Sequence, residues 1–323
     1  MLLPEDSEAC NSLILSDKEE RILAVVRDMT YVTALDIKHL LYPERSLTTM
    51  QRDLAKLSDS QDPHGRLLDR FPLPATTRGM KQFVYVLSTK GREVMGVEGY
   101  YRPYKQKALS YSHIRHHLCL TRFVCSARVW CHTDPHVRLA DIRLCYELAK
   151  ELAKAETTTQ GTPSPAPVVP DGYLNFELLQ KENGSHLSYM PTWIEIDRGT
   201  EYRNRFQNHV EDRIEYIRSD KYAKFFNENA VRIAYATIST RDEDRQSRLT
   251  AMRHWTLEVL TDLKLEKWKT VFYFTTLVYE DLYDLKHFIE PVWQTPADDT
   301  KRHLLEKNPA QTSLPEGSKG ATS

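Results

Sequence analysis

The chain of 323 residues is poor in the features that mark several large protein classes. No run of about 18 apolar residues occurs, which excludes a transmembrane helix. The five cysteines are odd in number and form no Cys-x-x-Cys pair, which argues against a disulfide framework. The 11 glycines are scattered, so no glycine-rich phosphate loop is present. The net charge of −1 means that any surface for nucleic acid must be local.

The remaining composition fits an ordinary globular protein. Hydrophobic residues make up 41% of the chain and charged residues 28%, and a chain of this length is expected to form two domains. The first residues lack a basic segment followed by an apolar stretch, so we expect no signal peptide. Unpaired cysteines fit a reducing compartment, so we expect a cytoplasmic protein without a membrane partner.

Acidic residues mark the stretch around which the second half of the chain is organised. Trp193, Ile194 and Ile196 favour a strand, and Glu195 and Asp197 lie two residues apart, which places both carboxylates on one face. Asp171 precedes a second expected strand. Three carboxylates on adjacent strands predict a site for a hard cation, Mg²⁺ or Mn²⁺. The alternative is that all three are solvated on an exposed strand face.

The first domain is expected over residues 17–98. Three helices come first, Asp17 to Met29, Ala34 to Leu41 and Leu47 to Leu57, each preceded by a serine or threonine N-cap. Two extended stretches follow, Arg66 to Phe71 and Gln82 to Leu87. Three helices followed by a two-stranded ribbon is the order of a winged helix-turn-helix.

Basic residues in this domain predict a surface for double-stranded DNA. Between Arg66 and Arg115 the bases far outnumber the acids, although the chain as a whole is nearly neutral. The third helix would enter the major groove and the loop after Pro72 would contact phosphate or the minor groove. The expected DNA contacts are Arg45, Thr48, Thr49, Arg52, Lys56, Arg78 and Lys81. The alternative is a winged helix that binds protein, with solvated basic residues.

The second domain is expected over residues 112–290, after a connector at 99–111. Alternating strands and helices predict a three-layer α/β domain, which makes the chain a mixed α+β protein. We expect the polar segment at 156–167 to be a flexible loop and residues 300–323 to be a disordered tail. The expected helices are 112–130, Leu139 to Ala155, Tyr202 to Phe226, Asp244 to Leu263 and Glu280 to Ile289. The expected strands are Val168 to Leu178, Ser188 to Asp197, Val231 to Ser239 and Lys269 to Val278.

Several of these residues together resemble a known family. Pro170-Asp171, then Glu195-Ile-Asp-Arg-Gly-Thr200, then Lys221-Tyr222 are similar to the plasmid replication-relaxation family, whose layout also includes a winged helix and a histidine-bearing helix, here at His116. The resemblance covers Asp17 to about Ile289. It implies a bacterial protein that acts in replication or relaxation of plasmid or mobile-element DNA, with replication or mobilisation proteins, or a second copy of the chain, as further partners.

The second domain also resembles the PD-(D/E)xK nuclease fold, a restriction-endonuclease-like architecture. That resemblance implies that Asp171 and Glu195 hold Mg²⁺ and that a lysine assists the attacking water. Asp197 stands where the lysine is expected, and Lys221 on the following helix is the candidate replacement. The implied catalytic set is therefore Asp171, Glu195, Asp197 and Lys221, with the three acids as metal ligands.

Two classes of function stay open. In one, the protein is a metal-dependent nicking endonuclease, since nicking one strand relieves supercoiling. In the other, it is a non-catalytic DNA-binding scaffold or a transcription regulator with a degenerate nuclease-like domain. A covalent route through Tyr202 or Tyr222 is a further, weaker alternative, because no tyrosine-nucleophile motif surrounds them.

Overall fold

The computed structural model describes residues 15–73, 82–97, 111–157, 168–179, 186–239 and 241–305. The chain divides into two compact units between Arg115 and His116. Each unit has its own sheet, so the mixed α/β class predicted from the sequence is confirmed. None of the helices in these ranges is both long and apolar enough to cross a membrane.

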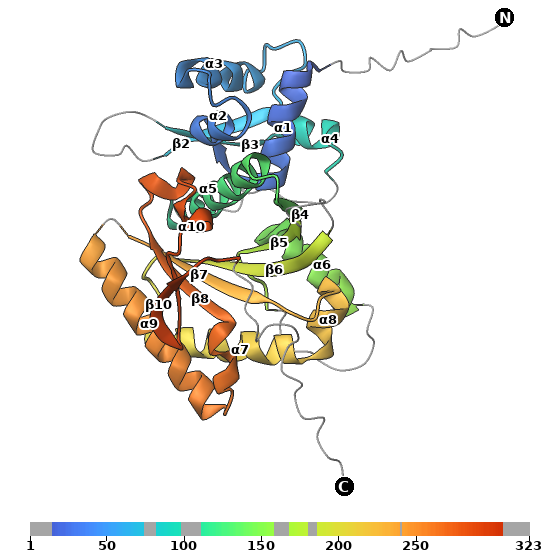
Figure 1. Ribbon diagram of the computed structural model, residues 1–323. Helices are drawn as coiled ribbons and strands as arrows, with labels where there is room; N and C mark the ends of the chain where they lie inside the picture. The colour runs from blue at the N-terminus through green and yellow to red at the C-terminus, as the bar shows by residue number, and fades with distance from the viewer. Residues whose placement is uncertain are drawn as a thin grey trace, which may run out of the picture. The chain divides into compact units, whose positions relative to one another are not determined.

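The first unit combines helices with a three-stranded antiparallel sheet (Figure 1). The sheet has the order β1-β3-β2, and its helices match the predicted bounds closely. The elements are α1 (Asp17–Met29), β1 (Val32–Thr33), α2 (Ala34–Leu41), α3 (Leu47–Leu57), β2 (Leu68–Pro72), β3 (Phe83–Leu87) and α4 (Thr89–Val94). The short strand β1 was not predicted, because two residues carry no periodic signal.

Side-chain caps explain why the helices of this unit begin where they do. Ser16 and Glu19 form a reciprocal capping box on α1, and Thr33 and Asp36 form one on α2. Ser46 accepts a hydrogen bond from the backbone N–H of Thr49 at the start of α3. The residues 74–81 lie outside the described ranges, so the predicted contacts of Arg78 and Lys81 do too.

The second unit is built on a seven-stranded mixed sheet with the order β10-β9-β8-β7-β6-β5-β4. Strands β6, β7 and β8 are parallel, and the pairs on either side of them are antiparallel. The strands are β4 (Val137–Leu144), β5 (Gly172–Leu179), β6 (His186–Asp197), β7 (Arg232–Ile238), β8 (Phe272–Leu277), β9 (Trp293–Thr295) and β10 (Asp298–Arg302).

Helices cover both faces of this sheet (Figure 1). On one face, Phe176 of β5 meets Trp130 and Phe288 from two helices. On the other, Trp193 of β6 and Tyr173 of β5 share a core with the remaining long helices. The helices are α5 (Tyr111–Thr133), α6 (Cys145–Thr157), α7 (Arg203–Arg218), α8 (Asp220–Phe226), α9 (Asp242–Asp262), η1 (Glu266–Thr270), η2 (Glu280–Tyr283) and α10 (Lys286–Ile289).

One predicted helix is wrong in its first half. The segment from Leu139 to Ala155 begins as strand β4, which pairs with β5 from Val137 opposite Leu178 to Leu144 opposite Gly172. Leu139 and Ile142 have helical spacing, whereas Ile142 and Leu144 have the spacing of one strand face, and pairing with β5 decides between the two. Two further predicted helices are each divided in two. The first becomes α7, which ends at Arg218, and α8, and the last becomes η2 and α10.

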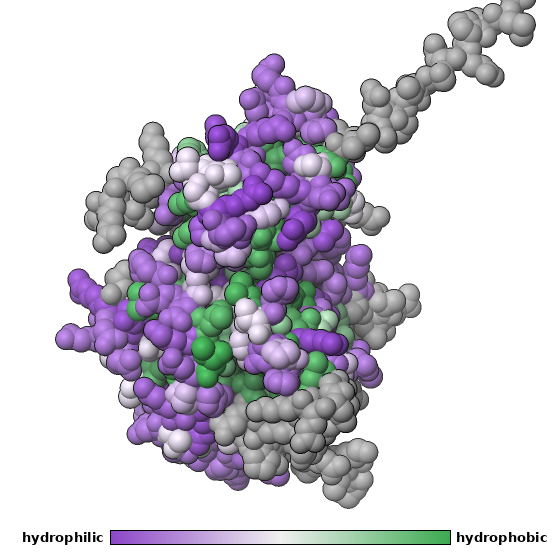
Figure 2. Space-filling view, turned by 45° about the horizontal axis from the view of Figure 1, so that its top comes forward, coloured by the Kyte–Doolittle hydropathy of each residue, from purple (hydrophilic) through white to green (hydrophobic). Residues whose placement is uncertain are grey.

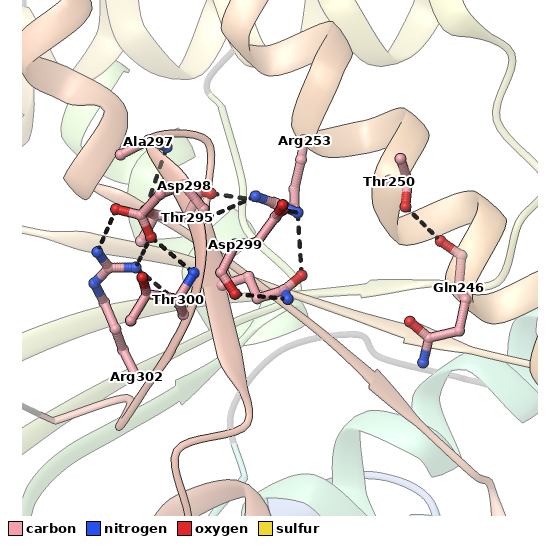
Figure 3. A network of polar contacts seen from close by, with 10 residues as sticks. Gln246, Thr250, Arg253, Thr295, Ala297, Asp298, Asp299, Thr300 and Arg302 are labelled. Carbon is pink, nitrogen blue, oxygen red and sulfur yellow. Dashed lines mark hydrogen bonds and ion pairs between the residues drawn. The ribbon is translucent and has the colours of Figure 1, made fainter.

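The predicted disordered tail begins too early. Residues 293–302 form the hairpin of β9 and β10. Arg253 of α9 holds this hairpin through the Thr295 carbonyl at 3.1 Å and the Asp299 carboxylate at 2.8 Å, as Figure 3 shows. Asp298 and Arg302 add an ion pair at 2.7 Å within β10. Arg253, which reaches across from α9, and the burial of Trp293 therefore both hold this polar segment in place.

Candidate functional site

The acidic stretch predicted to carry the chemistry ends the parallel strand β6 and faces β5. Asp171 immediately precedes β5, and Gly172 lies opposite Ile194 in the antiparallel ladder. The carboxylate Oδ2 of Asp171 accepts a hydrogen bond from the backbone N–H of Ile196 at 2.8 Å. The start of β5 and the carboxyl end of β6 therefore meet at one edge, which is where ligands bind in open α/β sheets.

His116 of α5 reaches the same carboxylate. Its Nε2 lies 3.0 Å from Oδ1 of Asp171, and both side chains are about one quarter exposed. Asp171 is thus held on both oxygens, one by a backbone N–H and one by an imidazole. The structure joins His116, which lies on the histidine-bearing helix, to the predicted acid, and so forms a partly buried histidine–carboxylate pair.

Glu195 forms a separate ion pair inside the unit. Its Oε1 lies 2.8 Å from both Nε and Nη2 of Arg213 on α7, and both side chains are about 10% exposed or less. Arg213 also donates through Nη1 to the carbonyl of His209 at 2.9 Å. The arginine is therefore fixed by its own helix as well as by the acid. Beside it, the buried hydroxyl of Tyr235 has no hydrogen-bond partner among the described residues.

Asp197 forms a third ion pair, which is bidentate. Its Oδ1 and Oδ2 accept from Nη2 and Nε of Arg248 on α9, each at 3.0 Å. Thr237 of β7 donates to the same carboxylate at 3.3 Å, and Arg248 donates to the carbonyl of Glu201 at 2.9 Å. This bidentate geometry is the strong form of an arginine–carboxylate contact. The position at which the nuclease motif expects a lysine is thus used to bind an arginine.

Burial and neighbouring charges separate the pKa values of the two adjacent acids. Burial raises the pKa of Glu195 to about 7, with Asp171 adding to the rise and Arg213 opposing it. Burial also acts to raise the pKa of Asp171, but the hydrogen bond and charge of His116 outweigh it and leave that pKa below its ordinary value. Burial lowers the pKa of His116, but Asp171 outweighs burial and leaves it raised. Acids whose pKa values are pushed apart are typical of sites that transfer protons.

The arrangement does not fit the predicted Mg²⁺ or Mn²⁺ site. Glu195 and Asp197 are each paired with an arginine, and Asp171 contacts the imidazole of His116. Across the described residues, no group of three or more His, Cys, Asp or Glu side chains is placed to hold a metal ion. A carboxylate held by an arginine has little charge left for a cation. Metal binding by these three acids stays a prediction that the geometry does not support.

Lys221 is exposed on α8, just before β7. Because β6 and β7 are parallel, α8 lies toward the amino ends of these strands, whereas Asp197 lies at the carboxyl end of β6. The proposed replacement for the missing lysine is therefore positioned toward the opposite end of the sheet.

Sequence reasoning missed Arg213 and Arg248, although a signal for them exists. Arg213 belongs to a helical stripe with Phe206, Val210 and Ile217, all of which are buried. A charged residue inside an apolar stripe must find a partner, and the acids on the preceding strand are the nearest candidates. The same argument places Arg248 beside Leu249 and Met252, which are buried on α9.

The first unit presents a basic surface where DNA contacts were predicted. Arg52 and Lys56 project from α3, Arg66 lies just before β2 and Arg70 lies within β2. These four side chains line one hollow of about 540 Å³, which also includes Ser58, Asp59 and Ser60. The face of this unit in Figure 2 is mainly hydrophilic. The remaining predicted contacts on α3 and before it, Thr48, Thr49 and Arg45, lie nearer its amino end, and Arg45 stacks over Tyr42 at 5.0 Å.

Comparison with known proteins identifies the family. No curated protein and no solved structure matched the chain. The model of one family, described as replication-relaxation, matches residues 23–228. The match covers more than half of the chain and includes α3, His116, Asp171, Glu195 and Arg213. The chain therefore belongs to the replication-relaxation family.

Proposed function

We propose that the protein binds duplex DNA through α3 and β2 of its first unit and acts in the replication or relaxation of plasmid DNA. Family membership supports a role in plasmid replication or relaxation. The proposal adds the surface that contacts the DNA. We name this surface, formed by Arg52, Lys56, Arg66 and Arg70, the basic hollow.

The observation that carries the proposal is the concentration of four cations in the basic hollow, with Asp59 as the acid that lines it. The chain as a whole has a net charge of −1, so this is a local departure from the average. Phosphate contacts by lysine and arginine supply most of the non-specific affinity for DNA, because they release condensed counterions. A helix flanked by such contacts is held in register on the duplex.

The existing contacts of these cations are weak enough to be exchanged for phosphate. Lys56 lies 3.2 Å from Glu19 and Arg66 lies 3.1 Å from Asp69, and both basic side chains are more than half exposed. Exposed pairs of this kind contribute about 0–1 kcal/mol. Arg52 is exposed, and no ion pair joins it to another described residue.

The experiment is fluorescence anisotropy of a labelled duplex against salt concentration. The wild type is compared with the double variant Arg52→Ala/Arg70→Ala and with Arg27→Ala, an exposed arginine of α1 outside the hollow. Losing two phosphate contacts should weaken binding and reduce the slope of log Kd against log salt by about 2. The control should match the wild type. An unchanged affinity and slope in the double variant would contradict the proposal.

A further inference from the structure

The partly buried pair of His116 and Asp171 has the geometry of an oriented imidazole. His116 uses Nε2 for its contact with Asp171 at 3.0 Å, and the other oxygen of Asp171 is fixed by the N–H of Ile196 at 2.8 Å. A carboxylate fixed on both oxygens cannot rotate away, so the ring orientation and the tautomer are set together. Nε2 then carries the proton that faces the carboxylate.

The other ring nitrogen is left for a ligand. Nδ1 of His116 has no hydrogen-bond partner among the described residues. In a neutral imidazole that donates through Nε2, Nδ1 is an acceptor. An oriented imidazole with one acceptor nitrogen at the carboxyl ends of parallel strands is placed to take a proton from a bound molecule.

A positively charged side chain lies near the ring of His116. Arg198 follows β6 directly and is close enough to His116 to repel its positive charge. It is half-buried and is followed by Gly199, whose φ of 71° turns the chain sharply after the strand. Arg213 at this edge is already paired with Glu195, so its charge is neutralised there. A cation such as Arg198 beside an oriented base suits a substrate with negative charge, such as a phosphodiester.

We propose that His116 is the general base of a phosphodiester hydrolysis that needs no resident metal ion, with Asp171 as its positioning residue. This inference rests on the proposed function, because DNA is the phosphodiester that the first unit is proposed to bind. It differs from the nuclease prediction in the group that activates water, which is an imidazole rather than a metal ion.

The chemical step balances with water as the second reactant. The water oxygen forms a bond to phosphorus while its proton moves to Nδ1 of His116. The bond between phosphorus and the deoxyribose oxygen breaks, and the leaving oxygen takes the proton from His116. Asp171 stabilises the imidazolium that exists between these two transfers, the role that a carboxylate has in histidine-based hydrolysis. No oxidant, cofactor or metal is consumed.

The experiment measures nicking of supercoiled plasmid by the full chain in the presence of EDTA. His116→Ala is compared with the wild type and with His132→Gln, which changes an exposed histidine on the same helix. At saturating DNA, loss of the general base should slow nicking about 100-fold or more, with unchanged DNA affinity. Free imidazole should restore part of the rate to His116→Ala, which a purely structural defect would not allow. Asp171→Asn should also lower the rate at saturating DNA.

Two results would overturn the proposal: wild-type protein that binds DNA but does not nick it in EDTA, or His116→Ala that nicks as fast as His132→Gln. Bis(4-nitrophenyl) phosphate is the second substrate, because its hydrolysis needs no DNA surface. Failure of DNA binding with hydrolysis of this compound intact would reject the basic hollow and leave His116 as the base. Loss of both in the wild type would reject both.

Discussion

Arg213 of α7 places Nε and Nη2 at 2.8 Å from the same carboxylate oxygen of Glu195 on β6. Both side chains are nearly buried, so the pair joins the helix to the sheet from within. A buried pair gains little over apolar residues of the same size, but breaking it leaves an uncompensated charge. Replacing only one of these two residues should therefore lower the stability of the second unit.

The first prediction concerns this pair. Glu195→Ala should lower the free energy of unfolding by about 3–5 kcal/mol, because Arg213 loses its acid while still buried. The double variant Glu195→Leu/Arg213→Met should recover most of that loss, since neither charge remains. Urea unfolding followed by circular dichroism gives both values. A double variant less stable than Glu195→Ala would show that the pair contributes net stability.

The second prediction uses the capping box of α1. Hydrogen bonds from Ser16 and Lys56 outweigh partial burial and lower the pKa of Glu19 from 4.5 to about 2. A depressed pKa in the folded state stabilises the protein above the unfolded value, and that stability is lost as pH falls from about 4.5 to 2. Glu19→Gln should destabilise the first unit at pH 7, by about 1 kcal/mol as for a lost cap, and less at pH 3. Thermal unfolding at both pH values tests this, with exposed Glu20→Gln as the control.

Local signals explain what the sequence could predict. Helices α1, α2 and α3 were located to the residue because Ser16, Thr33 and Ser46 cap them and apolar stripes follow. The strands of the second unit were located where β-branched and aromatic residues cluster, as in β7 and β8. In each case the residues that determine the secondary structure lie within the helix or strand itself or next to its first residue.

The predictions were wrong or incomplete where contacts with a distant segment of the chain determine the structure. β4 is a strand because β5 pairs with it, and the β9–β10 hairpin is held by Arg253 of α9 and by pairing with β8. Glu195 and Asp197 lie on β6 and Asp171 immediately precedes β5, but the partners of the first two, Arg213 and Arg248, come from helices 18 and 51 residues later. Spacing within one strand shows which face a carboxylate occupies and says nothing about the cation that will meet it.

The third prediction concerns Gly91 in α4. A Cβ there would lie 2.0 Å from the carbonyl oxygen of Leu67, a backbone atom that cannot move aside without disturbing the entry to β2. Gly91→Ala should therefore destabilise the first unit by more than the ordinary 1–3 kcal/mol of an overpacked core, by about 3 kcal/mol or more. Lys90→Ala, a change at the exposed neighbouring residue, should have little effect. Equal midpoints in urea for the two variants would contradict the close approach.

The fourth prediction concerns Tyr222 as a nucleophile. Its side chain is fully buried, its hydroxyl donates to the carbonyl of Ala230 at 2.8 Å, and burial raises its pKa strongly. A hydroxyl in this setting serves packing and is inaccessible to DNA. Tyr222→Phe should cost about 1 kcal/mol of stability and leave DNA affinity and nicking unchanged. Loss of nicking in a stably folded Tyr222→Phe protein would show that this account of the residue is wrong.

The last prediction addresses the departure from the nuclease motif at Asp197. Asp197→Lys restores the motif in sequence, but it replaces a carboxylate bound at 3.0 Å by two nitrogens of Arg248 with a second cation. The free energy of unfolding should fall by about 3–5 kcal/mol, because both cations would be buried without an acid. Combining Asp197→Lys with Arg248→Asp returns opposite charges to the two positions and should recover part of the loss. Nicking of plasmid DNA should gain no Mg²⁺ dependence in either variant, since Glu195 remains bound to Arg213. A stable Asp197→Lys protein with new Mg²⁺-dependent nicking would instead show that the arginine pairs yield readily to a metal ion.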